Sequence, residues 1–320
     1  MKKSLKIIGI ALGAIIVLIG AVAAYIHFTG IPSYEVNAPE LTIEADSARI
    51  ARGEYLVTMV CAECHRGQGN RLEGKRIFDI PEEFGEVWSP NITHHPESAL
   101  TGYTDGELVY FLRTGIKRNG KYVPPYMPKF PLLSDEDMAS VVAYLRSDAP
   151  PLRASDKPSV PTRPSFMTKA LSRVVFKPLP FPEEEIIAPP KTDKVAYGQY
   201  IATGAVECFG CHSADFTTNN LLEPEKSAGY MGGGNTLLNS QGEPVLSANI
   251  TMHPEHGLAG WTEAQFMQAV RFGKRPDGIP LSDAMPTFTT FTDEDLSAVW
   301  AYLQTVPQID NDVPRNFEQK

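Results

Sequence analysis

The sequence predicts a mostly helical protein built from two similar domains behind an N-terminal transmembrane helix. Three observations predict it: an apolar run of membrane-spanning length, a pentapeptide that occurs twice, and a long segment that repeats without a gap. With 320 residues the chain is long enough for two ordinary domains. The net charge of −9 argues against the basic face of a nucleic-acid-binding protein, so no nucleic-acid partner is expected.

The N-terminal segment, residues 1–30, is predicted to anchor the chain in a membrane. Three lysines precede an unbroken apolar run from Ile7 to Ile26, and twenty helical residues span roughly 30 Å, the thickness of the hydrocarbon layer. Because basic residues stay in the cytoplasm, the remainder of the chain is expected on the periplasmic face of a bacterial inner membrane. A cleaved signal peptide is the alternative, since Ala21-Val22-Ala23 is an acceptable cleavage site.

The pattern C-x-x-C-H occurs twice and contains all four cysteines. It is the attachment signature of c-type haem, in which each sulfur bonds a vinyl group and the histidine binds iron. A redox disulfide requires a thioredoxin-like setting that the flanking sequence lacks, and a zinc ribbon has no histidine at this place. Two intervening residues are an awkward spacing for structural disulfides. The sequence therefore predicts two covalently bound haem c groups, held by Cys61, Cys64, His65 and by Cys208, Cys211, His212.

The chain contains an internal duplication. A shift of 158 positions aligns residues 89–148 with residues 247–306 without a gap and gives 23 identities in 60 pairs. At the first cysteines of the two motifs the shift is 147, so the second copy carries an insertion, which we expect in the glycine-rich stretch 230–235. Two copies indicate a duplicated domain rather than a solenoid, which needs at least three repeats.

Each copy is predicted to consist of a few helices around its haem. Helices are expected at residues 46–60 and 193–206 before the motifs, from Thr104 and Thr262 with capping boxes, and at residues 135–146 and 293–304 behind the N-caps Ser134 and Thr292. A glycine within a helix costs about 1 kcal/mol relative to alanine. Gly53 and Gly198 therefore suggest close contact with another helix, which we expect to be the last one of each copy.

The organisation that follows has five parts: residues 1–30 as anchor, 46–150 as the first domain, 151–190 as connector, 191–307 as the second domain and 308–320 as tail. The stretch 150–190 contains ten prolines, which predicts an extended connector. Within it, the apolar residues of the segment 166–176 have helical spacing. We expect this segment to dock on a domain, with the membrane surface as the alternative.

The second axial ligand of each iron is predicted to be a methionine. Met127 and Met285 align across the duplication and lie in proline-containing Met-Pro loops, unlike the methionines that fill cores. His95 and His253 also align and would give bis-histidine ligation instead; a hydrogen bond in their turn is the role that we expect for them. Two further aligned residues, Arg113 and Arg271, are candidates for pairing with haem propionates or for a solvated helix face.

These features resemble the membrane-bound multihaem cytochrome c subunits of bacterial periplasmic dehydrogenases, of the alcohol and gluconate dehydrogenase type. The resemblance rests on the C-x-x-C-H sites, the Ser-x-Asn-Ile-Thr segments, the Met-Pro loops and the Asp-Glu-Asp helix starts, and it covers roughly residues 46–307. It implies tandem class I-like cytochrome c domains with His/Met-ligated haems. It also implies a dehydrogenase as electron donor and a quinone, an oxidase or a soluble cytochrome as acceptor. Many such subunits carry three haems, whereas this chain has two motifs.

The expected function is single-electron transfer by a carrier that has no catalytic residues of its own. A dihaem peroxidase is the enzymatic alternative, but the two haems of such an enzyme usually do different jobs, whereas the Met-Pro loops of the two copies are placed nearly symmetrically. A haem-based sensor is a third hypothesis, and it would need an output domain, for which few residues remain after residue 307.

Overall fold

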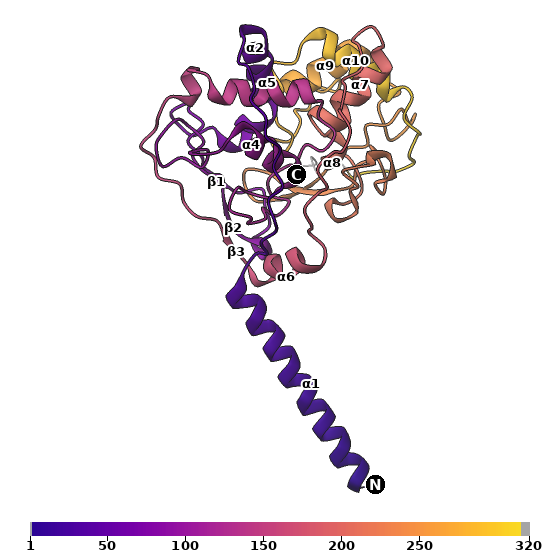
Figure 1. Ribbon diagram of the computed structural model, residues 1–320. Helices are drawn as coiled ribbons and strands as arrows, with labels where there is room; N and C mark the ends of the chain where they lie inside the picture. Colours follow the sequence, from indigo (N-terminus) through magenta and orange to yellow (C-terminus); the bar gives the residue numbers. More distant parts are fainter. Residues whose placement is uncertain (1, 315–320) are drawn as a thin grey trace.

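A computed structural model describes residues 2–314 as a rounded body on a long helical stem (Figure 1). The stem is α1 (Lys2–Thr29), which leaves its apolar side chains exposed. Among the described residues it is the one helix long and apolar enough to cross a membrane. The predicted apolar helix is therefore confirmed. Whether it is retained or cleaved stays open, because a signal sequence has the same length and composition.

The body is mostly helical, as predicted. Its helices are α2 (Ser47–Leu56), α3 (Ala62–His65), α4 (Asp105–Thr114), α5 (Asp135–Arg146), α6 (Phe166–Val174), α7 (Lys194–Tyr200), α8 (Cys208–Cys211), α9 (Glu263–Phe272) and α10 (Asp293–Leu303). Its strands, which we did not predict, are short: β1 (Arg76–Ile77), β2 (Gly85–Trp88), β3 (Arg163–Pro164), β4 (Thr236–Leu238) and β5 (Pro244–Leu246).

The strands form two small antiparallel sheets. In the order β1-β2-β3, Arg76 lies opposite Trp88 and Gly85 lies opposite Pro164, so the connector supplies the third strand. The strands β4 and β5 form a hairpin with Thr236 opposite Leu246. These sheets fasten loops to the body and do not form a core of their own.

The duplication is visible as two sets of helices, which we call repeat 1 (residues 46–150) and repeat 2 (residues 191–307). Thr104 and Thr262 both close capping boxes at the starts of α4 and α9. Ser134 and Thr292 both cap the last helices, so all four predicted caps are confirmed. Such caps can be predicted from sequence because they join residues three positions apart.

In each repeat, the first and last helices cross at a glycine. A Cβ built on Gly53 would lie 1.9 Å from the carbonyl oxygen of Ser140, and one on Gly198 would lie 1.9 Å from that of Ala298. The backbones of α2 and α5, and of α7 and α10, therefore meet where no side chain fits. This finding confirms the predicted helix pairs and the reason for their glycines.

The helices that lead into the two motifs differ from the prediction. Each contains a π-helical turn, Val57–Cys61 in repeat 1 and Ile201–Ala205 in repeat 2. In repeat 2 the helix then breaks at Glu207, which has a φ of 57°. Local hydrophobic spacing predicts a helix in both places but does not distinguish α from π turns.

The insertion in repeat 2 lies earlier than predicted. The backbone of Ile92 donates to Leu72, and that of Ile250 donates to Met231, so these pairs are equivalent. Leu72 lies seven positions after its haem-motif histidine, whereas Met231 lies nineteen after its own. The extra residues therefore belong to the loop 213–229, and the glycine-rich stretch is the shared part.

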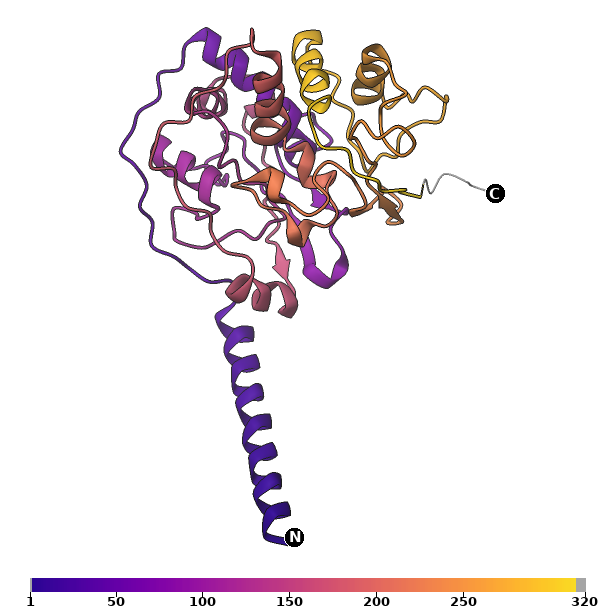
Figure 2. The same cartoon turned by 90° about the vertical axis from the view of Figure 1, so that its right-hand side faces the viewer.

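The two repeats share one hydrophobic core. Buried residues of both, such as Leu145 and Val142 of repeat 1 and Ile201 and Leu303 of repeat 2, belong to a single continuous cluster. Figure 2 shows the helices of both repeats packed into one body above the stem. The proline-rich connector therefore does not separate the two repeats into independent bodies.

The connector lies on the body and contains the predicted helix. α6 begins behind the N-cap Ser165 and packs beneath β2 and β3 next to the stem (Figure 1). The side that faces repeat 1 is polar, because Thr168 and Ser172 are buried there. The segment therefore docks on a domain, as expected, but through its polar side, since Phe166 and Val174 are exposed.

Candidate functional site

The histidines of the two motifs are held in the same way. His65 Nδ1 lies 3.0 Å from the carbonyl oxygen of Pro90, and His212 Nδ1 lies 2.8 Å from that of Ala248. A carbonyl only accepts, so Nδ1 carries the proton and the lone pair of Nε2 is available to a metal. Both rings are more than 90% buried, and burial lowers the pKa of each, which favours the neutral imidazole that binds iron.

No disulfide joins any of the four cysteines in the structure. Burial raises the pKa of Cys61 and Cys208 to about 12 and that of Cys64 and Cys211 to about 11. Reactive redox cysteines have lowered pKa values. The local environment therefore gives no support to a thioredoxin-like role.

The carbonyls that orient these histidines belong to matched turns. Asn91 Oδ1 accepts hydrogen bonds from the backbone and the hydroxyl of Thr93, at 2.9 and 2.7 Å. Asn249 and Thr251 form the same turn, at 3.0 and 2.7 Å. Because all four side chains are buried, each turn rigidly fixes the carbonyl just before it.

The segment that follows each repeat covers its turn. We call these segments the straps, residues 155–157 after repeat 1 and residues 309–312 after repeat 2. Asn91 Nδ2 donates to the carbonyl of Ser155 at 2.9 Å, and Asn249 Nδ2 donates to that of Ile309 at 2.7 Å. The first residues of the predicted connector and of the predicted tail are therefore parts of the two sites. Residues 315–320 of that tail lie outside the described part of the chain.

This arrangement fits a covalently attached haem in each repeat. The donor set is two thiols on one helical turn, followed at once by a neutral histidine whose Nδ1 is already satisfied. Cys61, Cys64 and His65 would hold one group, and Cys208, Cys211 and His212 the other. Such a group supplies an iron that takes up and releases one electron.

The two methionine loops are similar in path but different in support. Met127 and Met285 are half-buried and pack against the core, and each starts from a turn in which its N–H meets a carbonyl three residues earlier. In repeat 1, buried Lys129 donates to the carbonyls of Pro124 and Met127, both at 2.8 Å. Thr287 is at the equivalent position of repeat 2. The loop of Met127 is therefore clamped by an amine that repeat 2 lacks.

Lys129 also links its loop to the other haem motif. Glu207 is the residue before Cys208. Burial raises the pKa of its carboxyl group to about 8, and the positive charge of Lys129 partly opposes this shift. Glu207 in turn favours the charged form of Lys129, whose pKa burial lowers to about 7. A Cβ built on Gly204, just before the second motif, would lie 2.8 Å from the carbonyl oxygen of Leu132, just after Lys129. The methionine loop of repeat 1 thus adjoins the segment that leads into the haem motif of repeat 2.

The methionine loop of repeat 2 lies beside the haem motif of repeat 1 in the same way. A cleft of about 360 Å³ is lined by Ala62 and Arg66 of the first motif helix and by Pro286 and Phe288 of the second methionine loop. Each methionine loop therefore lies beside the haem motif of the other repeat. The sequence does not reveal this exchange, because it depends on how the repeats pack.

The two arginines that align across the duplication bind groups of the protein itself. Arg113 is 1% exposed and donates to the carbonyls of Phe130 and Pro131 and to Asp135. Arg271 donates to the carbonyl of Phe291 at 2.8 Å and pairs with Asp293 at 2.6 Å. Both tie the end of the methionine loop to the start of the last helix. These contacts give no support to pairing with propionates, which stays a prediction, and burial of Arg113 excludes the solvated helix face.

The second aligned pair of histidines lies in turns. The Nδ1 atoms of His95 and His253 both accept a backbone N–H at 3.1 Å, from Glu97 and His256. Their Nε2 atoms face Asp156 at 3.4 Å and Asp310 at 3.7 Å, in the straps. This geometry supports the expected role of both histidines in their turns. It gives no support to bis-histidine ligation.

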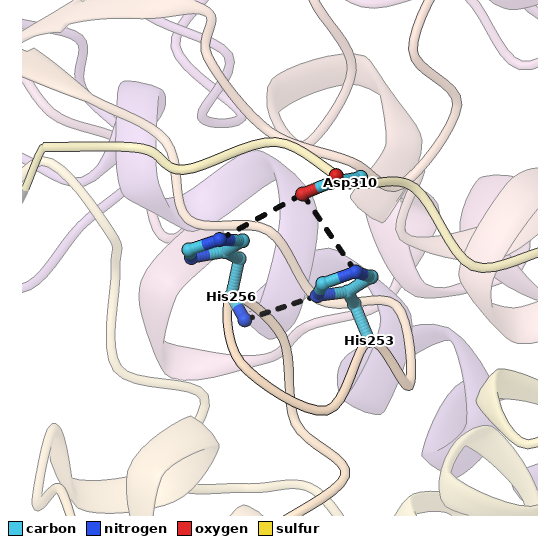
Figure 3. A group of neighbouring side chains, drawn as sticks. All are labelled: His253, His256 and Asp310. Carbon is cyan, nitrogen blue, oxygen red and sulfur yellow. Dashed lines mark hydrogen bonds and ion pairs between the residues drawn. The ribbon is translucent and has the colours of Figure 1, made fainter.

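Figure 3 shows a cluster that sequence reasoning missed, His253, His256 and Asp310. Its ligand atoms lie within 4.8 Å of one another, as in a metal site. However, His253 Nδ1 accepts an N–H, so its Nε2 carries the proton and offers no lone pair. The cluster is better explained as a polar group in which both histidines face Asp310 of the second strap.

Comparison with known proteins adds the decisive observation. Residues 48–145, which include the first motif and Met127, match the family described as cytochrome C oxidase, cbb3-type, subunit III. The chain contains a cytochrome c domain. This domain corresponds to repeat 1 almost from end to end.

The chain is similar to curated proteins over most of its length. It is 29% identical to the cytochrome c subunit of a quinone-dependent alcohol dehydrogenase from Gluconacetobacter polyoxogenes, with 84% of this chain and 58% of the relative covered. It is 30% identical to the fructose dehydrogenase cytochrome subunit of Gluconobacter japonicus, over 81% and 52%. A dihaem c-type cytochrome of Cereibacter sphaeroides is 26% identical, over 78% and 83%. The chain thus spans little more than half the length of the dehydrogenase subunits.

Proposed function

We propose that this chain is a membrane-anchored dihaem cytochrome c that transfers single electrons at the periplasmic face of a bacterial inner membrane. Residues 46–150 and 191–307 would be its two class I-like haem domains. His65 with Met127, and His212 with Met285, would be the axial ligand pairs. The chain would act as a carrier, without a catalytic site of its own.

The observation that carries the proposal is the repetition of the turn that orients each motif histidine. Each motif histidine meets a backbone carbonyl at equivalent positions, Pro90 and Ala248, and each such carbonyl precedes the same Asn-Ile-Thr turn. A carrier with two haems of the same kind needs two such sites. The likeness to a dihaem c-type cytochrome over 83% of that protein's length agrees with this count.

The packing of the repeats favours electron transfer between the two haems. Because each methionine loop lies beside the motif of the other repeat, both cofactors would lie along one interface inside a single rigid core. Rigid surroundings change little when the charge of a cofactor changes, which favours fast transfer.

A periplasmic dehydrogenase is the donor that we propose, with a quinone, an oxidase or a soluble cytochrome as acceptor. The support is the similarity to cytochrome subunits of alcohol and fructose dehydrogenases. None of the three relatives named above is called a peroxidase, and the matched methionine loops offer no feature that favours peroxidase chemistry at one haem.

The haem count can be measured on the intact holoprotein by mass spectrometry. We expect the mass of the chain plus two haems. A double substitution, Cys208→Ala with Cys211→Ala, should remove one haem and leave the first spectrum intact. The matched pair, Cys61→Ala with Cys64→Ala, should leave the second. A wild-type chain with fewer than two haems would contradict the proposal.

A further inference from the structure

The helix α6 lies at the level where the stem enters the body (Figures 1 and 2). Arg173 donates to the carbonyl of Gly30 at 2.9 Å, and its guanidinium lies 4.9 Å from the centre of the Tyr25 ring. Lys169 reaches the carbonyl of His27 at 3.4 Å. The apolar run of α1 ends at Ile26. α6 is therefore fixed beside the end of the membrane-spanning segment.

The faces of α6 are arranged in the reverse of the usual order for a surface helix. At about 100° per residue, its side chains fall into three sectors. The polar sector, Thr168 and Ser172, is buried against repeat 1, where the Thr168 hydroxyl donates to the carbonyl of Phe84 at 2.6 Å. The basic sector, Lys169 and Arg173, faces the stem.

The apolar sector points away from the protein. Phe166 is 47% exposed, Met167 37%, Val174 72% and, directly after the helix, Val175 52%. A helix normally buries this side in the body and leaves its polar side in water. Contiguous exposed apolar side chains rimmed by charged ones are typical of protein or membrane contacts.

We propose that the apolar sector of α6 is embedded in the outer surface of the same bilayer that α1 crosses. Phe166, Met167, Val174 and Val175 would enter the boundary between headgroups and acyl chains. Exposed Lys177 would meet anionic headgroups, as basic residues of interfacial helices do. The proposal rests on retention of α1 as an anchor, and the position of α6 beside the end of α1 is what selects lipid as the occupant.

A second membrane contact would fix the orientation of the haem domains. A single stem lets the body turn about its axis, whereas a helix of about 14 Å lying flat on the surface resists that rotation. The N-cap hydroxyl of Ser165 and the side chain of Thr168 bind the carbonyls of Glu83 and Phe84. Repeat 1 would therefore be held against the membrane in one orientation.

Spin labels on the full-length holoprotein test this contact. The holoprotein would be placed in nanodiscs of phosphatidylcholine and phosphatidylglycerol, with the haem cysteines already used by the cofactors. Labels at Met167→Cys and Val175→Cys would report on α6, and one at Val195→Cys, exposed on α7 at the far end of the body, is the control. A label at Ile16→Cys reports on the anchor itself.

We expect collisions with dissolved oxygen to exceed those with a water-soluble nickel chelate at both α6 positions, by several times relative to the α7 control. Equal accessibility at α6 and α7, with a lipid-like signal at Ile16→Cys, would overturn the proposal while sparing the anchor. A water-like signal at Ile16→Cys would refute the anchor as well. Protection of α6 that appears only with an added partner protein would also overturn it.

Discussion

The hydroxyl of Tyr200, in the first helix of repeat 2, donates a 2.6 Å hydrogen bond to Asp137, in the last helix of repeat 1. The equivalent residues with the repeats exchanged, Tyr55 of repeat 1 and Asp295 of repeat 2, are also hydrogen-bonded. The two repeats therefore exchange the same contact, as expected of a duplicated domain that packs against its copy with approximate two-fold symmetry. This reciprocity places both haem motifs at one interface.

Loss of one of these hydroxyls should loosen the interface. Tyr200→Phe removes the hydrogen bond to the buried carboxylate of Asp137, which keeps its pair with Arg52 at 2.7 Å. We expect the free energy of unfolding of the holoprotein in detergent to fall by about 1–3 kcal/mol. The control is Tyr34→Phe, whose hydroxyl makes no hydrogen bond among the described residues. Equal small effects of both substitutions would show that the contact contributes nothing.

The contribution of Tyr200 should depend on pH. Burial, followed by the charge of Asp137, raises the pKa of this phenol. In the unfolded chain it ionises near pH 10, so its stabilising effect is complete below about pH 10 and is lost as the pH rises further. The stability difference between wild type and Tyr200→Phe should therefore shrink above about pH 10 in urea titrations. A difference that stays constant to higher pH would contradict this assignment.

The glycine crossings should not tolerate a methyl group. Gly53→Ala gains helix propensity of about 1 kcal/mol but places Cβ 1.9 Å from the carbonyl oxygen of Ser140. The overlap should prevail, with a net loss of about 1–3 kcal/mol in thermal or chemical unfolding. Gly260→Ala, where no atom lies within 4 Å, should change stability by less than about 0.5 kcal/mol. Similar results for the two variants would argue against the close crossing.

Lys129 should support methionine ligation in repeat 1 alone. Lys129→Met removes both hydrogen bonds to the carbonyls of Pro124 and Met127. We expect partial loss of the far-red absorption band of His/Met haem and a lower potential for one haem, with the other unchanged. Exposed Lys121→Met is the matched control. An unaltered band and potential in Lys129→Met would show that the clamp is not needed.

The parts of the structure that sequence predicts are the local ones. The two C-x-x-C-H motifs, the caps Ser134 and Thr292, and the glycines at the helix crossings all act over a few residues or repeat in register. Because of the duplication, each of these motifs, caps and glycines occurs in both copies.

The parts that it does not predict depend on tertiary packing. The hydrogen bonds of Tyr200 and Tyr55 across the repeats, and the contact of Gly204 with Leu132, join residues 63 or more positions apart. The apolar side of α6 had the right period, but periodicity does not tell which side faces the protein. The partners of Arg113 and Arg271 lie about twenty residues away, so local patterns do not predict what these arginines bind.

An optical redox titration of the holoprotein, with and without carbon monoxide, tests the central claim most directly. A dihaem carrier with Met127 and Met285 bound should show two one-electron steps at the raised potentials of His/Met haems, both insensitive to carbon monoxide. A haem that binds carbon monoxide, or one at a much lower potential, would contradict the paired electron carrier.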